Sequence, residues 1–226
     1  MEKGKLIVIE GTDCSGKETQ TQKLINYLES QGKKVKSFSF PMYDTPTGKI
    51  IGGPLLGKEY ICDGWFPEGA THVDGNVAAL YYAADRYYNI HKIMDALNEG
   101  YTVILDRYIY SNMGHQAGKL AKKEERLERY KFIEKLEFDL LQLPKPDGVI
   151  LLFMPVQEAK IIRAQRPEKL DQAESDEKHL MQAQNAYLEM AELYNFNVIN
   201  CAINGNIRTI DEISKDVIKA FEKING

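Results

Sequence analysis

A short apolar run leads directly into a glycine-rich loop near the start of the chain, and this pairing limits the fold strongly. Leu6–Ile9 reads "LIVI", and Gly11–Gln20 reads "GTDCSGKETQ". The loop follows the pattern G-x-x-x-x-G-K-[ST] up to Lys17, and Gly11 and Gly16 permit a tight turn. Backbone N–H groups of such a loop, the start of the following helix and the lysine together hold phosphate groups. The stretch therefore predicts a strand–loop–helix unit that binds a nucleotide.

The position after Lys17 departs from the pattern. Glu18 stands where a hydroxyl side chain normally helps to hold Mg²⁺. Thr19 does not replace it, because the next residue along a helix points about 100° away. Three interpretations of Glu18 fit the sequence: it ligates the metal directly or through water, it points away and caps the helix, or the site is impaired. We favour the first two, and Asp106, which ends a predicted strand at the same edge, is the other candidate metal ligand.

Further apolar runs complete the pattern of a parallel sheet. Three read as continuous buried strands, at Val103–Leu105, Val149–Phe153 and Phe196–Cys201, and a weaker, alternating run at Val35–Phe40 is typical of an edge strand. Helical patterns separate the runs at Thr19–Ser30, Asn76–Leu97, Glu124–Leu141, Gln157–Ala164, Ser175–Tyr194 and Thr209–Ile224. We therefore expect an α/β fold, a three-layer α/β/α P-loop NTPase fold with a parallel five-stranded sheet, formed by residues 1–226 as a single domain.

The composition excludes several classes of partner. The chain has 226 residues, a formal net charge of −4 and no apolar run near the length of a membrane span, so we expect neither nucleic-acid nor membrane binding. The first apolar run is also too short for a signal peptide. Cys14, Cys62 and Cys201 lack the spacing of a disulfide framework or a zinc site, which is typical of a reducing compartment and predicts a cytoplasmic location.

A Gly- and Pro-rich segment interrupts the alternation of strands and helices at Gly52–Gly75, and it contains the single Trp of the chain. This composition is typical of a long surface excursion; a substrate lid and a dimer contact are the alternatives. The charged cluster Lys122–Arg129 predicts a solvated helix face.

Six segments together resemble the thymidylate kinase family, P-loop enzymes that phosphorylate dTMP with ATP and Mg²⁺. They are "GTDCSGKETQ", "FPMYDTPTGKII", "LYYAADR", "DRYIYSNMGHQ", "LPKPDGVILL" and "RAQRPEKLDQAESDEKHL", in this order along most of the chain. The resemblance implies a homodimeric kinase that makes dTDP for dTTP synthesis, with ATP and Mg²⁺ as its cofactors. It assigns ATP binding to the loop residues Gly11, Thr12, Asp13, Cys14, Ser15, Gly16, Lys17, Glu18 and Thr19.

The resemblance also implies a pocket for the acceptor nucleotide, lined by Phe40, Tyr82, Arg86, Arg107, Ser111, Asn112, His115 and Gln116. Phe40 and Tyr82 would enclose the base. Arg86 would donate to a thymine carbonyl, while Asn112 and Gln116 would contact the polar edge of the base. His115 stands where an aromatic residue in relatives crowds the 2′ position of the sugar. The alternative for Arg86 is a surface ion pair with Asp85 or Glu99.

The implied catalytic residues are Asp13, Lys17, Arg107, Arg163 and Arg166. Asp13 would approach the sugar and the transferring phosphate, and Arg107 would hold the acceptor phosphate through paired donors. Cys14 stands where some family members carry a loop arginine, so a lid at about residues 160–175 would supply that cation from Arg163 or Arg166. The alternative is that both arginines solvate a helix end.

Two departures from the family pattern concern the acceptor and the lid. The segment "FPMYD" lacks the arginine that relatives carry there, and the first arginine of the chain is Arg86. Lys49 or Arg107 would then have to bind the acceptor phosphate. Asp171 is followed by Gln172, where many relatives have Asp-Arg. These gaps leave two alternatives open: a deoxynucleoside or broader deoxynucleotide kinase, and a non-catalytic nucleotide-binding protein.

Overall fold

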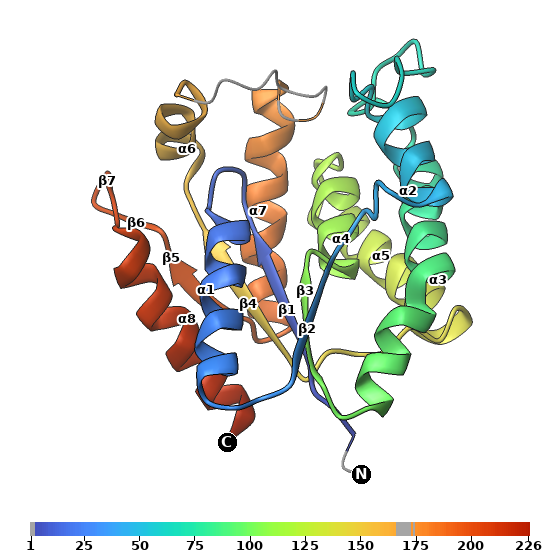
Figure 1. Cartoon of the computed structure of the whole chain (residues 1–226). Helices are drawn as coiled ribbons and strands as arrows, with labels where there is room; N and C mark the ends of the chain where they lie inside the picture. Colours follow the sequence, from blue (N-terminus) through green and yellow to red (C-terminus); the bar gives the residue numbers. More distant parts are fainter. Residues whose placement is uncertain (1–2, 166–172, 174) are drawn as a thin grey trace.

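The computed structural model describes residues 3–165, 173 and 175–226, and five parallel strands form its central sheet. The strands are β1 (Leu6–Gly11), β2 (Val35–Ser39), β3 (Thr102–Asp106), β4 (Gly148–Phe153) and β5 (Asn197–Asn200), in the order β2-β3-β1-β4-β5 (Figure 1). All five predicted strands are present, and β2 lies at an edge as expected. The phosphate loop leaves the carboxyl end of the central strand, where Ile9 pairs with Asp106 and Gly11 pairs with Leu152.

Helices connect the strands. They are α1 (Lys17–Ser30), α2 (Pro46–Ile50), η1 (Ile51–Leu55), α3 (Gly75–Asn98), α4 (Ile109–Gly118), α5 (Lys123–Glu134), η2 (Lys135–Leu140), α6 (Val156–Arg163), α7 (Glu177–Leu193) and α8 (Ile210–Asn225), where η marks a π-helix. A small antiparallel hairpin, β6 (Ala202–Ile203) and β7 (Asn206–Ile207), precedes α8. Among the described residues, no helix is both long and apolar enough to cross a bilayer.

Helix α4 was not predicted as a helix from the sequence. Its residues include Gly114, Gly118 and Asn112, which have low helix propensity. It forms nonetheless because its buried face, with Ile109 and Met113, packs into the core. The predicted helix Glu124–Leu141 is α-helical to Glu134 and continues as η2.

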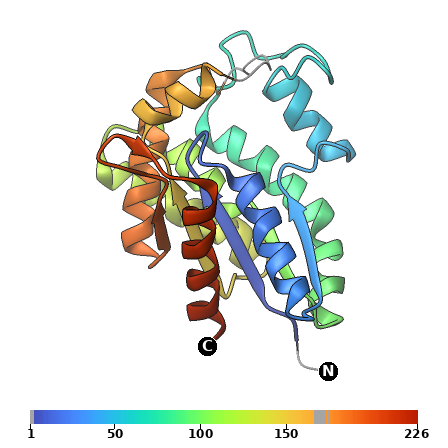
Figure 2. The ribbon, with the colours of Figure 1, turned by 60° about the vertical axis from the view of Figure 1, so that its left-hand side comes forward.

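The strands alternate their side chains between two cores, as a doubly covered sheet requires. In β1, Leu6 and Val8 face a core that contains residues of α3, α4 and α7, whereas Ile7 and Ile9 face a core that contains residues of α1 and α8. Figure 2 shows α1 and α8 side by side over one face of the sheet, and α3, α4 and α7 cover the opposite face. The three-layer α/β/α architecture is therefore confirmed.

The segment 52–75 forms a third, smaller core above the sheet. Leu55, Leu56, Ala70 and Val73 are buried there with Ala78 of α3. Ala173 packs against the same cluster. Although this excursion is irregular, it therefore contacts both α3 and the segment that precedes α7.

Candidate functional site

The phosphate loop has the backbone that its glycines predict. Gly16 has a φ of 76° and is the N-cap of α1, and Cys14 shares this left-handed region with a φ of 54°. A Cβ atom on Gly11 would lie 2.5 Å from Ser15 Oγ and 2.9 Å from the carbonyl oxygen of Leu152, so the turn leaves no room for a side chain. Thr12 Oγ1 donates to the carbonyl oxygen of Met154 at 2.7 Å, which ties the loop to the residue after β4.

Lys17 folds back over the loop that carries it. Its Nζ donates to the carbonyl oxygens of Gly11 and Thr12, both at 3.2 Å. Burial, with a further contribution from Arg107, lowers the pKa of Lys17 to about 8. This ammonium group lies over the loop where phosphate groups would be held.

The two candidate metal ligands have different surroundings. Asp106 ends β3 beside the loop, and its Oδ1 is buried without a hydrogen-bond partner, as is Ser15 Oγ. Glu18 is exposed in the first turn of α1, and its side chain makes no hydrogen bond to the described part of the chain. The described residues contain no group of three or more His, Cys, Asp or Glu side chains that could hold a metal ion. A Mg²⁺ site of one carboxylate, waters and substrate phosphates needs no such cluster, so Asp106 fits the ion.

Asp13 and Arg163 join the loop to the end of α6. Arg163 donates to Asp13 Oδ2 through Nε at 2.9 Å and Nη2 at 2.5 Å. Burial alone would raise the pKa of Asp13, but the hydrogen bonds and charge of Arg163 lower it overall. Arg163 thus lies at the phosphate loop, whereas Arg166, Asp171 and Gln172 lie outside the described residues.

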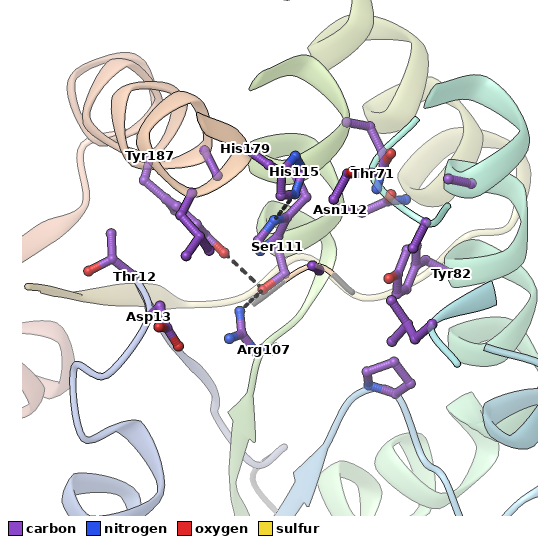
Figure 3. Close-up of a pocket in the computed structure, with 18 of the residues that line it drawn as sticks. Thr12, Asp13, Thr71, Tyr82, Arg107, Ser111, Asn112, His115, His179 and Tyr187 are labelled. Carbon is purple, nitrogen blue, oxygen red and sulfur yellow. Dashed lines mark hydrogen bonds between the residues drawn. The ribbon is translucent and has the colours of Figure 1, made fainter. Parts of the chain in front are cut away.

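All eight predicted acceptor-site residues line one cavity of about 250 Å³, together with Gly11, Thr12 and Asp13 of the loop. They are Phe40, Tyr82, Arg86, Arg107, Ser111, Asn112, His115 and Gln116. Figure 3 shows Ser111 between Arg107 and Tyr187, with Tyr82 on the side of the cavity opposite Asp13. Lys49 is exposed on α2 and does not line the cavity.

The alternative prediction for Arg86, a surface ion pair with Asp85 or Glu99, is wrong. Arg86 is buried, and it forms a two-pronged pair with Glu137 of η2, from Nε to Oε2 at 2.5 Å and from Nη2 to Oε1 at 2.6 Å. The proposed partners bind elsewhere: Asp85 accepts hydrogen bonds from the Met42 N–H and the Thr47 hydroxyl, and Glu99 pairs with Lys36. The pair fixes the plane of the guanidinium group and leaves further N–H groups for a ligand.

Two amide side chains in the cavity have buried oxygens without partners, Asn112 Oδ1 and Gln116 Oε1. The orientation of Asn112 follows from its contacts, because its Nδ2 donates to the Ala79 carbonyl at 3.1 Å and to Glu137 Oε1 at 2.9 Å, and both are acceptors. Buried acceptors without donors cost free energy, about 1–3 kcal/mol each. A ligand with an N–H group at this position would remove that cost.

A buried carboxylate that the sequence reasoning missed organises the base of the cavity. Glu10 Oε1 accepts from the backbone N–H groups of Tyr108 (2.8 Å) and Ser111 (3.0 Å), and Oε2 accepts from Ser111 Oγ (2.6 Å) and Tyr187 OH (3.1 Å). Burial raises the pKa of Glu10, and the Ser111 hydrogen bond and Arg107 oppose this rise. The sequence does contain one signal that could have identified Glu10: it is a charged residue between a predicted buried strand and Gly11.

Arg107 extends from this network into the cavity. Its Nη1 donates to Ser111 Oγ at 3.2 Å, and its backbone has a φ of 66°. Burial would lower the pKa of Arg107, but the neighbouring Tyr187 and the negative charges of Asp106 and Glu10 raise it above its usual value. The side chain is therefore a permanent cation beside the predicted metal ligand.

The half-buried His115 of α4 and the buried His179 of α7 form a pair. His115 Nδ1 and His179 Nε2 lie 3.1 Å apart, and the rings stack with centroids 5.2 Å apart (Figure 3). Burial, followed by the charge of His179 and more distant cations, lowers the pKa of His115 well below its usual value. The shifted pKa favours the neutral ring, and a bond between two ring nitrogens needs one of them to lack its proton.

The depressed pKa of His115 predicts a loss of stability at mildly acidic pH. The folded protein keeps His115 neutral while the unfolded chain binds a proton below about pH 6.5, so stability is full above this value and falls as the pH decreases. The free energy of unfolding should decrease by up to about 1.4 kcal/mol per pH unit from this group. Urea unfolding at a series of pH values measures it, and His115→Asn should flatten the slope.

The matched control is His91→Asn, since His91 is exposed on α3. This variant should keep the slope of the wild-type protein. If His115→Asn also kept it, the histidine pair would not be the origin of the acid sensitivity.

Comparison with known proteins identifies relatives that match most of the chain. The family model described as Thymidylate kinase matches residues 9–213. The thymidylate kinase of Schizosaccharomyces pombe is 33% identical over 195 residues, covering 84% of this chain and 80% of the relative. A probable thymidylate kinase of Thermococcus gammatolerans is 30% identical over 224 residues, covering 97% of both chains.

A solved structure of another protein has a similar fold. The thymidylate kinase of Candida albicans, described as revealing the origin of broad substrate specificity and a novel structural element, superimposes with a TM-score of 0.71. It is 27% identical, and the match covers 99% of this chain and 93% of that one. The phosphate loop, the cavity beside it and these matches lead to one conclusion: the chain belongs to the thymidylate kinase family.

Proposed function

We propose that the chain transfers the γ-phosphate of ATP to dTMP, giving dTDP for dTTP synthesis. The observation that carries the choice of acceptor is the donor and acceptor pattern in the cavity. Thymine presents one ring N–H between two carbonyl oxygens. Asn112 Oδ1 and Gln116 Oε1 are buried acceptors for such an N–H group, and the free N–H groups of Arg86 are donors for a carbonyl.

Separate cations would bind the phosphates of ATP and the phosphate of the acceptor nucleotide. Lys17 lies over the loop, where it would bind the phosphates of ATP, and Arg107 would bind the acceptor phosphate with paired donors. Arg163, held at the loop by Asp13, would neutralise charge that develops on the transferring group. The acceptor phosphate is already anionic, so the reaction needs little help from a general base.

Asp106 would hold Mg²⁺, and Glu18 would not ligate it directly. The buried, unpartnered Oδ1 of Asp106 and the exposed position of Glu18 support this division. When bound, the ion would stabilise negative charge on the ATP phosphates. Glu18 instead places a negative charge in the first turn of α1, where the helix dipole stabilises it.

The remaining features of the enzyme follow from the same architecture. Residues 1–226 would form a single kinase domain, in which a lid at about residues 160–175 closes over ATP and excludes water. An apolar stripe on α3 would form a homodimer contact: Val77, Leu80, Tyr87 and Tyr88 are exposed and lie on one helix face. Cys14, Cys62 and Cys201 form no disulfide bond, which supports a cytoplasmic location.

Acceptor specificity tests the proposed function. A coupled ADP assay with ATP and Mg²⁺ should give its highest kcat/KM with dTMP, compared with thymidine, dUMP and dGMP. Arg107→Lys keeps the positive charge but removes the paired donors, so kcat/KM for dTMP should fall by at least about tenfold. Turnover of thymidine without turnover of dTMP would make the chain a deoxynucleoside kinase. ATP binding with no transfer to any acceptor would make it a non-catalytic nucleotide-binding protein.

The metal assignment predicts a large effect for one substitution and little effect for another. Asp106→Asn should raise the Mg²⁺ concentration needed for half-maximal activity by about 10–100-fold, because it removes a carboxylate from the site. Glu18→Ser, which restores the hydroxyl of the usual loop pattern, should leave that concentration and ATP affinity within about threefold of wild type, as expected for an exposed side chain. A large Mg²⁺ effect of Glu18→Ser alone would assign the metal to Glu18 instead.

A further inference from the structure

A turn at residues 40–47, which leads from β2 into α2, brings Phe40 and Pro41 to the wall of the cavity. The Phe40 N–H donates to the Asp106 carbonyl at 3.0 Å, which continues the pairing of β2 with β3 by one residue. Pro41 has no N–H to donate. Beyond Pro41 the chain leaves the sheet, so the position of this part of the wall depends on what holds the rest of the turn.

The carboxylate of Asp85, on α3, holds that turn. Its Oδ2 accepts from the Met42 N–H at 2.9 Å, and its Oδ1 accepts from the Thr47 hydroxyl at 2.7 Å and from Asn89 Nδ2 at 3.0 Å. Asp85 and Met42 are both buried, with exposed fractions of 1% and 7%. Both carboxylate oxygens are therefore used, and two of these three donors belong to the turn.

Neutral donors, rather than the neighbouring Arg86, bind this carboxylate. The Arg86 guanidinium is paired with Glu137 of η2. Hydrogen bonds to a charged acceptor are about twice as strong as those between neutral groups. The contacts of Asp85 therefore attach the turn to α3 more firmly than bonds to a neutral side chain would.

The same helix supplies other parts of the cavity wall. Asp85 is not among the described residues that line the cavity, whereas Tyr82 and Arg86, on either side of it in the sequence, both line it. Helix α2 packs against α3 (Figure 1). Asp85 thus joins the part of the wall formed by Phe40 and Pro41 to the helix that supplies Tyr82 and Arg86.

We propose that Asp85 is a positioning residue for the base of the acceptor nucleotide. By holding the turn against α3, its carboxylate sets the space between Phe40 and Arg86, which receives a flat pyrimidine ring. The proposal rests on the proposed function, because it needs a nucleotide base in this cavity. Asp85 acts on the cavity through the turn and not through an ion pair with Arg86.

Steady-state kinetics of Asp85→Asn tests this role. The amide has the size of the carboxylate, but in either orientation its NH₂ group faces a donor, the Met42 N–H or Asn89 Nδ2. The turn should loosen, and dTMP must then reorder it on binding. KM for dTMP should rise by about tenfold, the population change expected for one lost charged hydrogen bond, while kcat stays within about threefold and KM for ATP within about twofold.

The matched control is Asp95→Asn, at an exposed aspartate of the same helix, which should keep the KM of wild type. A second pair of variants changes a donor of the turn. Thr47→Val removes the hydroxyl and keeps the shape of the side chain, so KM for dTMP should rise by about threefold. Thr47→Ser keeps a hydroxyl and should behave like wild type. Thr47 is not among the described residues that line the cavity, so its effect must pass through the turn.

Three results would overturn the assignment. A KM for dTMP within about twofold of wild type in Asp85→Asn, even with a lower kcat, would reflect loss of folded enzyme alone. An equal rise in KM for ATP would show a general distortion of the site. The same KM in Thr47→Val and Thr47→Ser would remove the hydroxyl from the contact.

Turnover of dTMP by the wild-type enzyme separates these outcomes from failure of the proposed function. If wild type turns over dTMP, any of the three results removes only the role of Asp85. If wild type turns over no dTMP, the proposed function fails, and the role of Asp85 fails with it.

Discussion

The carboxylate of Glu10 holds together the three elements on which the site depends. It is the next-to-last residue of the central strand, directly before Gly11, and it has no solvent exposure. Four donors bind it: the backbone N–H groups of Tyr108 and Ser111 at the start of α4, the Ser111 hydroxyl and the Tyr187 hydroxyl of α7. The first N–H groups of a helix lack the usual acceptor one turn earlier. The carboxylate accepts from the buried Tyr108 N–H, and it shares the Ser111 N–H with the Tyr108 carbonyl, which lies 3.2 Å from that nitrogen.

The buried Glu10 carboxylate also affects the cationic side chains that can bind a substrate. The carboxylates of Asp106 and Glu10 stabilise the cationic form of Arg107, while Asp13 holds Arg163 at the loop. Burial acts in the other direction on Lys17 and lowers its pKa to about 8. The site therefore concentrates positive charge on a chain whose formal net charge is −4, and this local arrangement is what polyanionic nucleotides require.

Local patterns in the sequence predicted the strands and most of the helices, and the resemblance to a known family predicted eight residues that line the cavity. Contacts between distant segments could not be predicted in this way. Arg86 and Glu137 are 51 positions apart, and they pair only because the fold brings a residue of α3 and a residue of η2 together. Helix α4 was missed because its propensity is low and its burial stabilises it.

The most direct test of this account is the effect of Glu10→Gln on kcat/KM for dTMP. An amide keeps the shape of the side chain but places an NH₂ group where the carboxylate accepts from N–H or O–H donors. If Glu10 organises α4 and Arg107, kcat/KM should fall by about 100-fold or more, while the protein still unfolds cooperatively and binds ATP with affinity near that of wild type. A kcat/KM within about threefold of wild type would contradict the account.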